Sequence, residues 1–85
     1  MAEIWRPRLA SEVWVLVLEH RDGQDVTVHQ TEAGARDYLL AYCQEFWREV
    51  SDAPFPLEEE EGVAEYFQAS TDRYSINHCY IRNGR

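Results

Sequence analysis

The chain of 85 residues contains no lysine, which excludes chemistry that depends on a lysine Schiff base or a lysine general base. Its two cysteines, Cys43 and Cys79, are too few for a disulfide framework. The longest apolar run, Val13 to Leu18, is far shorter than the roughly 20 residues of a membrane-spanning helix. The residues after Met1 lack the apolar core of a secretory signal. We therefore expect a cytoplasmic protein with free thiols and no membrane contact.

The length is that of one domain, 1–85, and excludes a multi-domain enzyme. We expect a loose arm over residues 1–11, where Pro7 holds Arg6 extended, and a frayed polar tail over residues 82–85. A collapsed domain of this size has a radius of gyration of about 12 Å, which leaves room for one thin core and no deep cleft.

Negative charge dominates the chain, with 16 acidic residues against 8 arginines and a net charge of -8. The charge is uneven, because residues 37–65 hold nine acids and one arginine. An anionic surface repels phosphate, so direct binding to nucleic acid or to an anionic membrane is disfavoured. The expected partner is a basic protein or a nucleic-acid-binding complex.

Two apolar segments flank Asp22-Gly23 and predict a β-hairpin, since a type I′ turn favours this dipeptide. With Asp22-Gly23 as the two-residue loop, Val17 faces Val28. The valines then share one side of the sheet, which we predict to be the buried side. The opposite side, predicted to stay partly open, carries Trp14, Leu16, Leu18, His20, Asp25, Thr27 and His29. A longer loop would exchange the two sides.

Two helices and a third strand follow the hairpin. Thr31 is the predicted N-cap of a helix that reaches about Val50, with an apolar stripe at three- and four-residue spacing. A shorter helix begins at Glu58 and runs through Gln68, and residues 74–81 alternate as a strand. We predict an α+β fold: a three-stranded antiparallel sheet with two helices, in the order ββααβ, with the last strand beside the first. The predicted core unites Val15, Val17, Leu39, Phe46 and Phe67.

Several segments together resemble small hypothetical proteins of high-GC bacteria and of their plasmids or phages. The segments are residues 13–16, 20–26, 31–36, 45–47, 64–67 and 72–76. Those proteins have no established activity. The resemblance implies a single fold across the chain and a mobile-element context, and it assigns no functional residue.

The histidines and cysteines do not form a metal or catalytic pattern. His20 and His29 are expected roughly 13 Å apart on the sheet, too far to share one ion, and His78 and Cys79 point to opposite faces. Cys43 and His78 would make a nucleophile–base pair only if the long helix crossed the last strand. Because Cys43 lies on the apolar stripe, we expect a buried, inert thiol. The sequence therefore predicts no metal, no cofactor and no catalytic residue.

The acidic run is the strongest candidate binding surface. It consists of Asp52, Glu58, Glu59, Glu60, Glu61 and Glu65. One interpretation is a solvated surface kept for solubility, and the other is a surface that imitates a phosphate backbone. Trp14, on the side of the sheet expected to be open, is a further candidate contact.

Two functional hypotheses follow from these surfaces. The first is a non-catalytic acidic protein-binding module, in its sharpest form a mobile-element inhibitor that resembles anti-CRISPR proteins and blocks a nucleic-acid-binding complex by charge mimicry. The alternative is a homodimeric accessory protein whose open sheet face self-associates and whose acidity serves solubility only.

Overall fold

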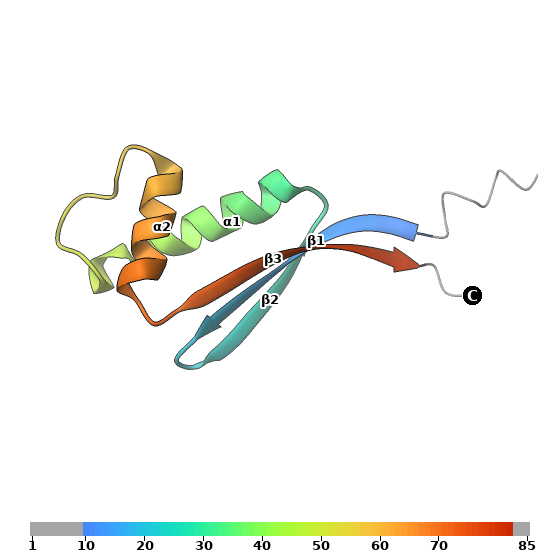
Figure 1. The fold of residues 1–85 in the computed structure, drawn as a ribbon, viewed down its shortest axis with the longest axis horizontal. Coiled ribbons are helices and arrows are strands. Elements are labelled where there is room, and N and C mark those ends of the chain that lie inside the picture. Colours follow the sequence, from blue (N-terminus) through green and yellow to red (C-terminus); the bar gives the residue numbers. More distant parts are fainter. Residues whose placement is uncertain (1–9, 83–85) are drawn as a thin grey trace, which may run out of the picture.

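The computed structural model describes residues 10–82 and has the predicted α+β architecture (Figure 1). Strands β1 (Ala10–His20), β2 (Gly23–His29) and β3 (Arg73–Arg82) form one antiparallel sheet in the order β2-β1-β3. Helix α1 (Glu32–Glu45), the short 3-10 helix η3 (Trp47–Glu49) and helix α2 (Glu59–Ala69) lie between β2 and β3 in the chain. The order ββααβ and the pairing of the last strand beside the first are confirmed.

The predicted arm and tail lie mostly outside the described residues. The boundary of the arm is wrong by two residues, because Ala10 and Ser11 belong to β1. Arg82, placed in the tail by the sequence, is the last residue of β3 and pairs with Ala10. The backbone hydrogen bonds of the β1–β3 ladder account for both extensions.

The hairpin turn is displaced by one residue from its predicted position. His20 pairs with Gly23, so that Arg21 and Asp22 form the loop. Gly23 has a φ of 135°, a conformation that side chains disfavour, which explains why glycine follows the aspartate. Val17 therefore faces Val26 rather than Val28. The β2 partner of each β1 residue is thus two residues from the predicted one. Since side chains alternate with a period of two, the valines still share one side of the sheet.

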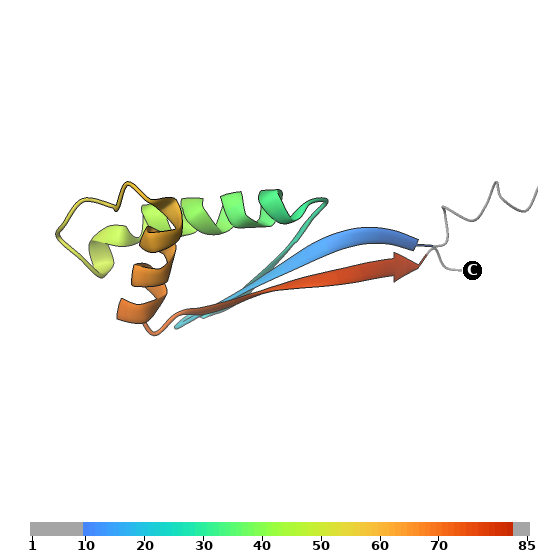
Figure 2. The same cartoon turned by 45° about the horizontal axis from the view of Figure 1, so that its top comes forward.

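The predicted choice of the buried side is wrong. Leu16 and Leu18 are almost fully buried and form the first core cluster with Ala35 and Leu39 of α1. Both helices lie on the leucine side (Figure 2), and of the five valines on the other side only Val13 is buried. Val26 and Val28 are 54% and 58% exposed. Leucine and tryptophan side chains bury more apolar area than valine, so the single helical layer covers the side that carries them.

The predicted core is correct in part. Leu39 is buried, whereas Val15 and Val17 point to the uncovered side. Phe46 and Phe67 pack at the border of a second core cluster formed by Cys43, Trp47 and Tyr66.

Helix α1 begins as predicted and ends early. Thr31 Oγ1 accepts a hydrogen bond from the backbone N–H of Gly34 at 2.9 Å and caps the first turn. The α-helix ends at Glu45 rather than near Val50, and η3 continues the chain. The tighter winding of η3 directs the Trp47 side chain into the second cluster. There its Nε1–H donates to the Ala53 carbonyl at 2.6 Å. The indole therefore fixes the loop that leads to α2.

The molecule is more elongated than predicted. Its radius of gyration is 16.7 Å against the expected value of about 12 Å, and it measures 60 × 28 × 16 Å. The reason is the sheet, because β1 and β3 continue past the end of β2 as a two-stranded ribbon in which residues 10–13 pair with residues 79–82 (Figure 1).

The two sides of the sheet differ in their sensitivity to substitution. We expect Leu16→Ala to lower the free energy of unfolding by about 2–5 kcal/mol, because it leaves a cavity beneath α1. Val28→Thr should change it by less than about 0.5 kcal/mol. Urea unfolding at low protein concentration measures both values. A larger loss for Val28→Thr would mean that the helices cover the valine side.

Gly62, in the first half of α2, is required because the Phe55 ring packs directly on its Cα. A methyl group there would overlap the ring. We expect Gly62→Ala to destabilise the fold, since overpacking costs about 1–3 kcal/mol and exceeds the gain in helix propensity of about 1 kcal/mol. In a Phe55→Ala background the same substitution should stabilise it. Thermal unfolding of the four proteins tests this reversal of sign.

Candidate functional site

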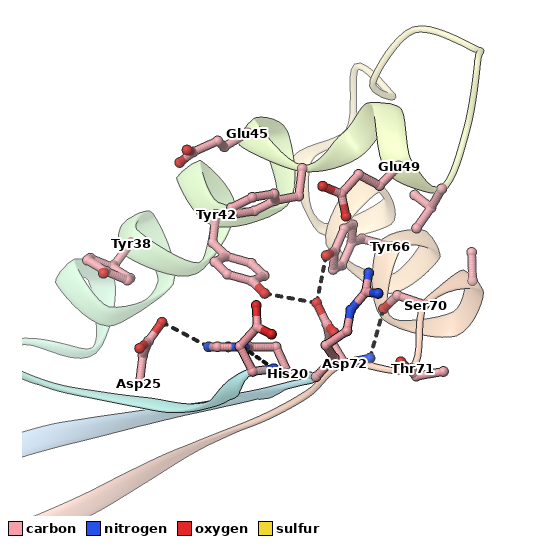
Figure 3. Close-up of a pocket in the computed structure, with 15 residues that line it drawn as sticks. His20, Asp25, Tyr38, Tyr42, Glu45, Glu49, Tyr66, Ser70, Thr71 and Asp72 are labelled. Carbon is pink, nitrogen blue, oxygen red and sulfur yellow. Dashed lines mark hydrogen bonds and ion pairs between the residues drawn. The ribbon is translucent and has the colours of Figure 1, made fainter.

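A groove of about 890 Å³ lies between the β1–β2 turn and the adjoining ends of α1 and α2 (Figure 3). We call it the acidic groove, because five carboxylates line it against Arg21 and His20. The carboxylates belong to Asp22, Asp25, Glu45, Glu49 and Asp72. Three tyrosine rings, Tyr38, Tyr42 and Tyr66, form its helical wall. The groove thus combines negative charge with aromatic surface.

Asp72 is the centre of the hydrogen bonds in this groove. Its Oδ2 accepts the Tyr42 hydroxyl at 2.8 Å and the Tyr66 hydroxyl at 2.7 Å (Figure 3). Its backbone N–H donates to Ser70 Oγ at 3.2 Å. Tyr42 comes from α1, Tyr66 comes from α2, and Asp72 immediately precedes β3. One carboxylate oxygen therefore joins both helices to the start of the last strand.

Burial keeps the groups around Asp72 protonated. Desolvation, strengthened by the hydrogen bond to Asp72, raises the pKa of Tyr42 to about 12. The same causes raise the pKa of Tyr66 still further. Desolvation and the nearby Asp72 charge also raise the pKa of the Cys43 thiol to about 12. At neutral pH both tyrosines act as hydrogen-bond donors, and Cys43 carries no thiolate.

The hairpin contributes the opposite wall of the groove. The backbone N–H of Asp22 donates to His20 Nδ1 at 3.3 Å, so the ring proton of a neutral His20 lies on Nε2. That Nε2 lies 3.3 Å from Asp25 Oδ2 and donates to it. His20 is thus occupied within the turn, while the Asp25 side chain remains exposed at 55%.

The six acidic residues predicted from the sequence are all exposed, and we call them the α2 acidic surface. Glu59, Glu60 and Glu61 form the first turn of α2, where the helix dipole stabilises carboxylates. Within residues 10–82, none of the six takes part in an ion pair. Glu59 and Glu60 also line a smaller groove of about 480 Å³ with Asp37 of α1. The structure therefore adds Asp37 to this surface.

The net charge of the whole protein lies in the helical segment, residues 32–69. This segment carries ten acids and two arginines, and the rest of the chain carries six of each. Arg36 is paired with Glu32 at 3.2 Å, one turn earlier on α1. The helical side of the molecule is therefore strongly anionic, and the remainder is neutral in sum.

Trp14 does not lie on an open face, which corrects its prediction as an exposed contact. It packs at the border of the first cluster, and its ring stacks on His78 with centroids 4.5 Å apart. His78 Nε2 lies 2.9 Å from Glu12 Oε1 on the ribbon. Trp47 is buried, and Trp5 lies outside the described residues.

Cys43 and His78 are not brought together. Cys43 is enclosed by the second cluster, whereas His78 contacts Trp14 and Tyr80 on the sheet. In the described part of the chain, no three His, Cys, Asp or Glu side chains are placed to hold a metal ion. No helix there is long and apolar enough to cross a membrane.

Sequence reasoning missed the acidic groove and its centre. The sequence pattern assigns no functional role to Asp72, Tyr42 or Tyr66. The tyrosine hydroxyls were the available signal, because a buried tyrosine needs a hydrogen-bond partner. The pairing of residues 30 positions apart depends on how α2 crosses α1, which periodicity does not encode.

Comparison with known proteins does not extend this description. No protein-family model, no curated protein and no solved structure matches the chain. The fold and the two acidic surfaces are therefore the basis of the functional argument.

The two tyrosines bonded to Asp72, together with Cys43, make stability fall in alkali. In the unfolded chain the thiol and the phenols lose their protons near pH 9 and pH 10, whereas the folded state holds them to about 12. The contribution of these protonated groups to the free energy of unfolding is complete below pH 9 and is lost as the pH rises toward 12. The double variant Tyr42→Phe/Tyr66→Phe should lose about 1–3 kcal/mol at neutral pH and show a weaker alkaline decline. Urea unfolding across pH 7–11 measures this, with Tyr80→Phe as the exposed control. An unchanged slope would contradict the argument.

Proposed function

We propose that the protein is a non-catalytic protein-binding module whose helical side docks against a cationic surface of its partner. The observation that carries this proposal is the confinement of the whole net charge of -8 to residues 32–69. A helical segment with ten acids and two arginines is complementary to a groove rich in arginine and lysine. Such grooves are the usual phosphate-binding surfaces of nucleic-acid-binding proteins.

The geometry supports recognition of arginine in particular. Within residues 10–82 the carboxylates of the α2 acidic surface take part in no ion pair, and a carboxylate can accept two parallel hydrogen bonds from a guanidinium. The acidic groove adds aromatic rings, among them Tyr38 at 44% exposure, beside Asp25 and Glu45. A cation that enters the groove would meet both a carboxylate and a ring face.

The helical side is also preorganised for binding. The second core cluster and the hydrogen bonds to Asp72 fix α1 and α2 relative to each other before any partner arrives. A rigid charged surface loses little conformational entropy on association. The protonated Cys43 thiol and tyrosine hydroxyls favour this binding role over nucleophilic chemistry.

The more specific form of the proposal is an inhibitor from a mobile element that acts in the cytoplasm. It rests on the resemblance to small plasmid and phage proteins together with the anionic helical side. Such a protein would occupy the channel of a nucleic-acid-handling complex in place of the phosphate backbone, as anti-CRISPR proteins of the charge-mimic type do. The protein would then compete with nucleic acid without binding it.

A pair of matched variants tests the location of the binding surface. We expect Glu59→Gln/Glu60→Gln to weaken binding of an oligo-arginine peptide several-fold, because both side chains lie on the α2 acidic surface. Glu12→Gln/Glu19→Gln, on β1, removes the same charge and should leave binding nearly unchanged. Fluorescence anisotropy at increasing NaCl measures both, and binding should weaken with salt because the charges are exposed.

The same variants test competition with nucleic acid. A partner captured from host lysate by the parent protein should be released by added DNA, and the Glu59→Gln/Glu60→Gln variant should capture less of it than the β1 variant. Equal capture by the two variants, or capture that neither salt nor DNA disturbs, would show that charge mimicry is wrong.

A further inference from the structure

The side of the sheet opposite the helices carries an exposed apolar patch, which Ser75 and Asn77 of β3 border, and Val13 on the same side is buried. We call it the valine face and define it by Val15, Val17, Val26, Val28 and Ile81. Val15 pairs with Val28 and Val17 pairs with Val26, so four valines form one contiguous block across β1 and β2. Val26, Val28 and Ile81 are each more than half exposed. Soluble monomers seldom expose contiguous apolar patches of several hundred Å².

The charge of this face differs from that of the rest of the molecule. Between residues 12 and 81, Glu19 and Arg73 are the only charged residues on this side of the sheet. They pair with each other at one end of the β1–β3 ladder, so their charges cancel. The face is therefore neutral on a protein with a net charge of -8. A strongly basic partner finds no counter-charge there, whereas a second copy of the chain meets no repulsion.

The position of the helical segment removes the main obstacle to self-association. When two sheets stack face to face they lie about 10 Å apart, and the helices of each copy lie on the outer sides (Figure 2). The two anionic helical segments are then separated by more than twice the Debye length of about 8 Å at physiological ionic strength. Their mutual repulsion is largely screened.

The dimensions of the sheet suit a weak dimer. With ten paired positions between β1 and β3 and seven between β1 and β2, the flat area of this whole side of the sheet, polar positions included, is roughly 440 Å² per copy. A stacked pair would bury about 900 Å² in flat area, below the 1,200–2,000 Å² of stable complexes and above most crystal contacts. We therefore expect reversible, concentration-dependent association.

From these observations we propose that two copies of the protein associate through their valine faces, sheet against sheet. This goes beyond the proposed binding function, because it concerns a different surface and a different partner. The dimer has both anionic helical segments on its outside. It would present two binding surfaces in opposite directions, which favours partners that are themselves paired or repeated.

Sedimentation velocity over a range of concentrations tests the dimer. We expect the parent to shift from monomer to dimer, and Val26→Thr/Val28→Thr to raise the dissociation constant about tenfold or more, because four buried methyl contacts are lost per dimer. Threonine keeps the shape and strand propensity of valine, and far-UV circular dichroism verifies the fold. Leu57→Ser, which alters a fully exposed leucine in the loop before α2, is the matched control and should leave the constant unchanged.

Ile81→Thr gives a second, independent variant at the ribbon end of the same face and should also weaken the dimer. Added NaCl should strengthen the dimer, because it screens the residual repulsion between two anionic copies, whereas it should weaken binding to a cationic partner. The opposite effects of salt therefore distinguish a failure of the valine-face dimer from a failure of the proposed binding to a cationic partner. A monomer at all concentrations, or a dimer that keeps its affinity in both threonine variants, would overturn the valine-face dimer.

Discussion

The burial of Leu16 and Leu18 beneath α1 is the interaction on which the rest of the structure depends. Three strands and two helices provide a single helical layer, so only one side of the sheet is removed from water. Once the leucine side is covered, α1 is fixed along the sheet, α2 packs across α1, and the valine face is left outside (Figure 2). The bulk of the leucine side chains decides this choice, since more apolar area is buried than with valine.

Helix α2 is held mainly through α1, and the hydrogen bonds to Asp72 complete its attachment. Phe67 and Val63 reach the first cluster, and Tyr66 joins the second. The Asp72 carboxylate then links Tyr66 and Tyr42 at the point where the chain turns into β3. The acidic groove exists because the hairpin tip and the helix ends converge around this residue without filling the space between them.

The sequence predicted the elements well and their faces less well. Thr31 as N-cap, the pairing of β3 beside β1 and the stripe on α1 followed from local chemistry and spacing. The choice between Leu16 and Val17 as the buried side did not follow, because β1 is apolar on both sides and alternation carries no information there. Nor did the Asp72 contacts, which depend on the crossing of two helices. The acidic residues were predicted to be exposed because charge alone determines that outcome.

The pairing of Ala10 with Arg82 has a consequence for how the fold connects to other chains. The backbone enters the first strand and leaves the last strand side by side, at the end of the ribbon farthest from α2 (Figure 1). A surface loop of another protein therefore needs little distortion to accept this fold as an insertion, because its entry and exit points are already neighbours. For the same reason, a fusion joined at the ribbon would stand clear of the acidic groove and of the α2 acidic surface.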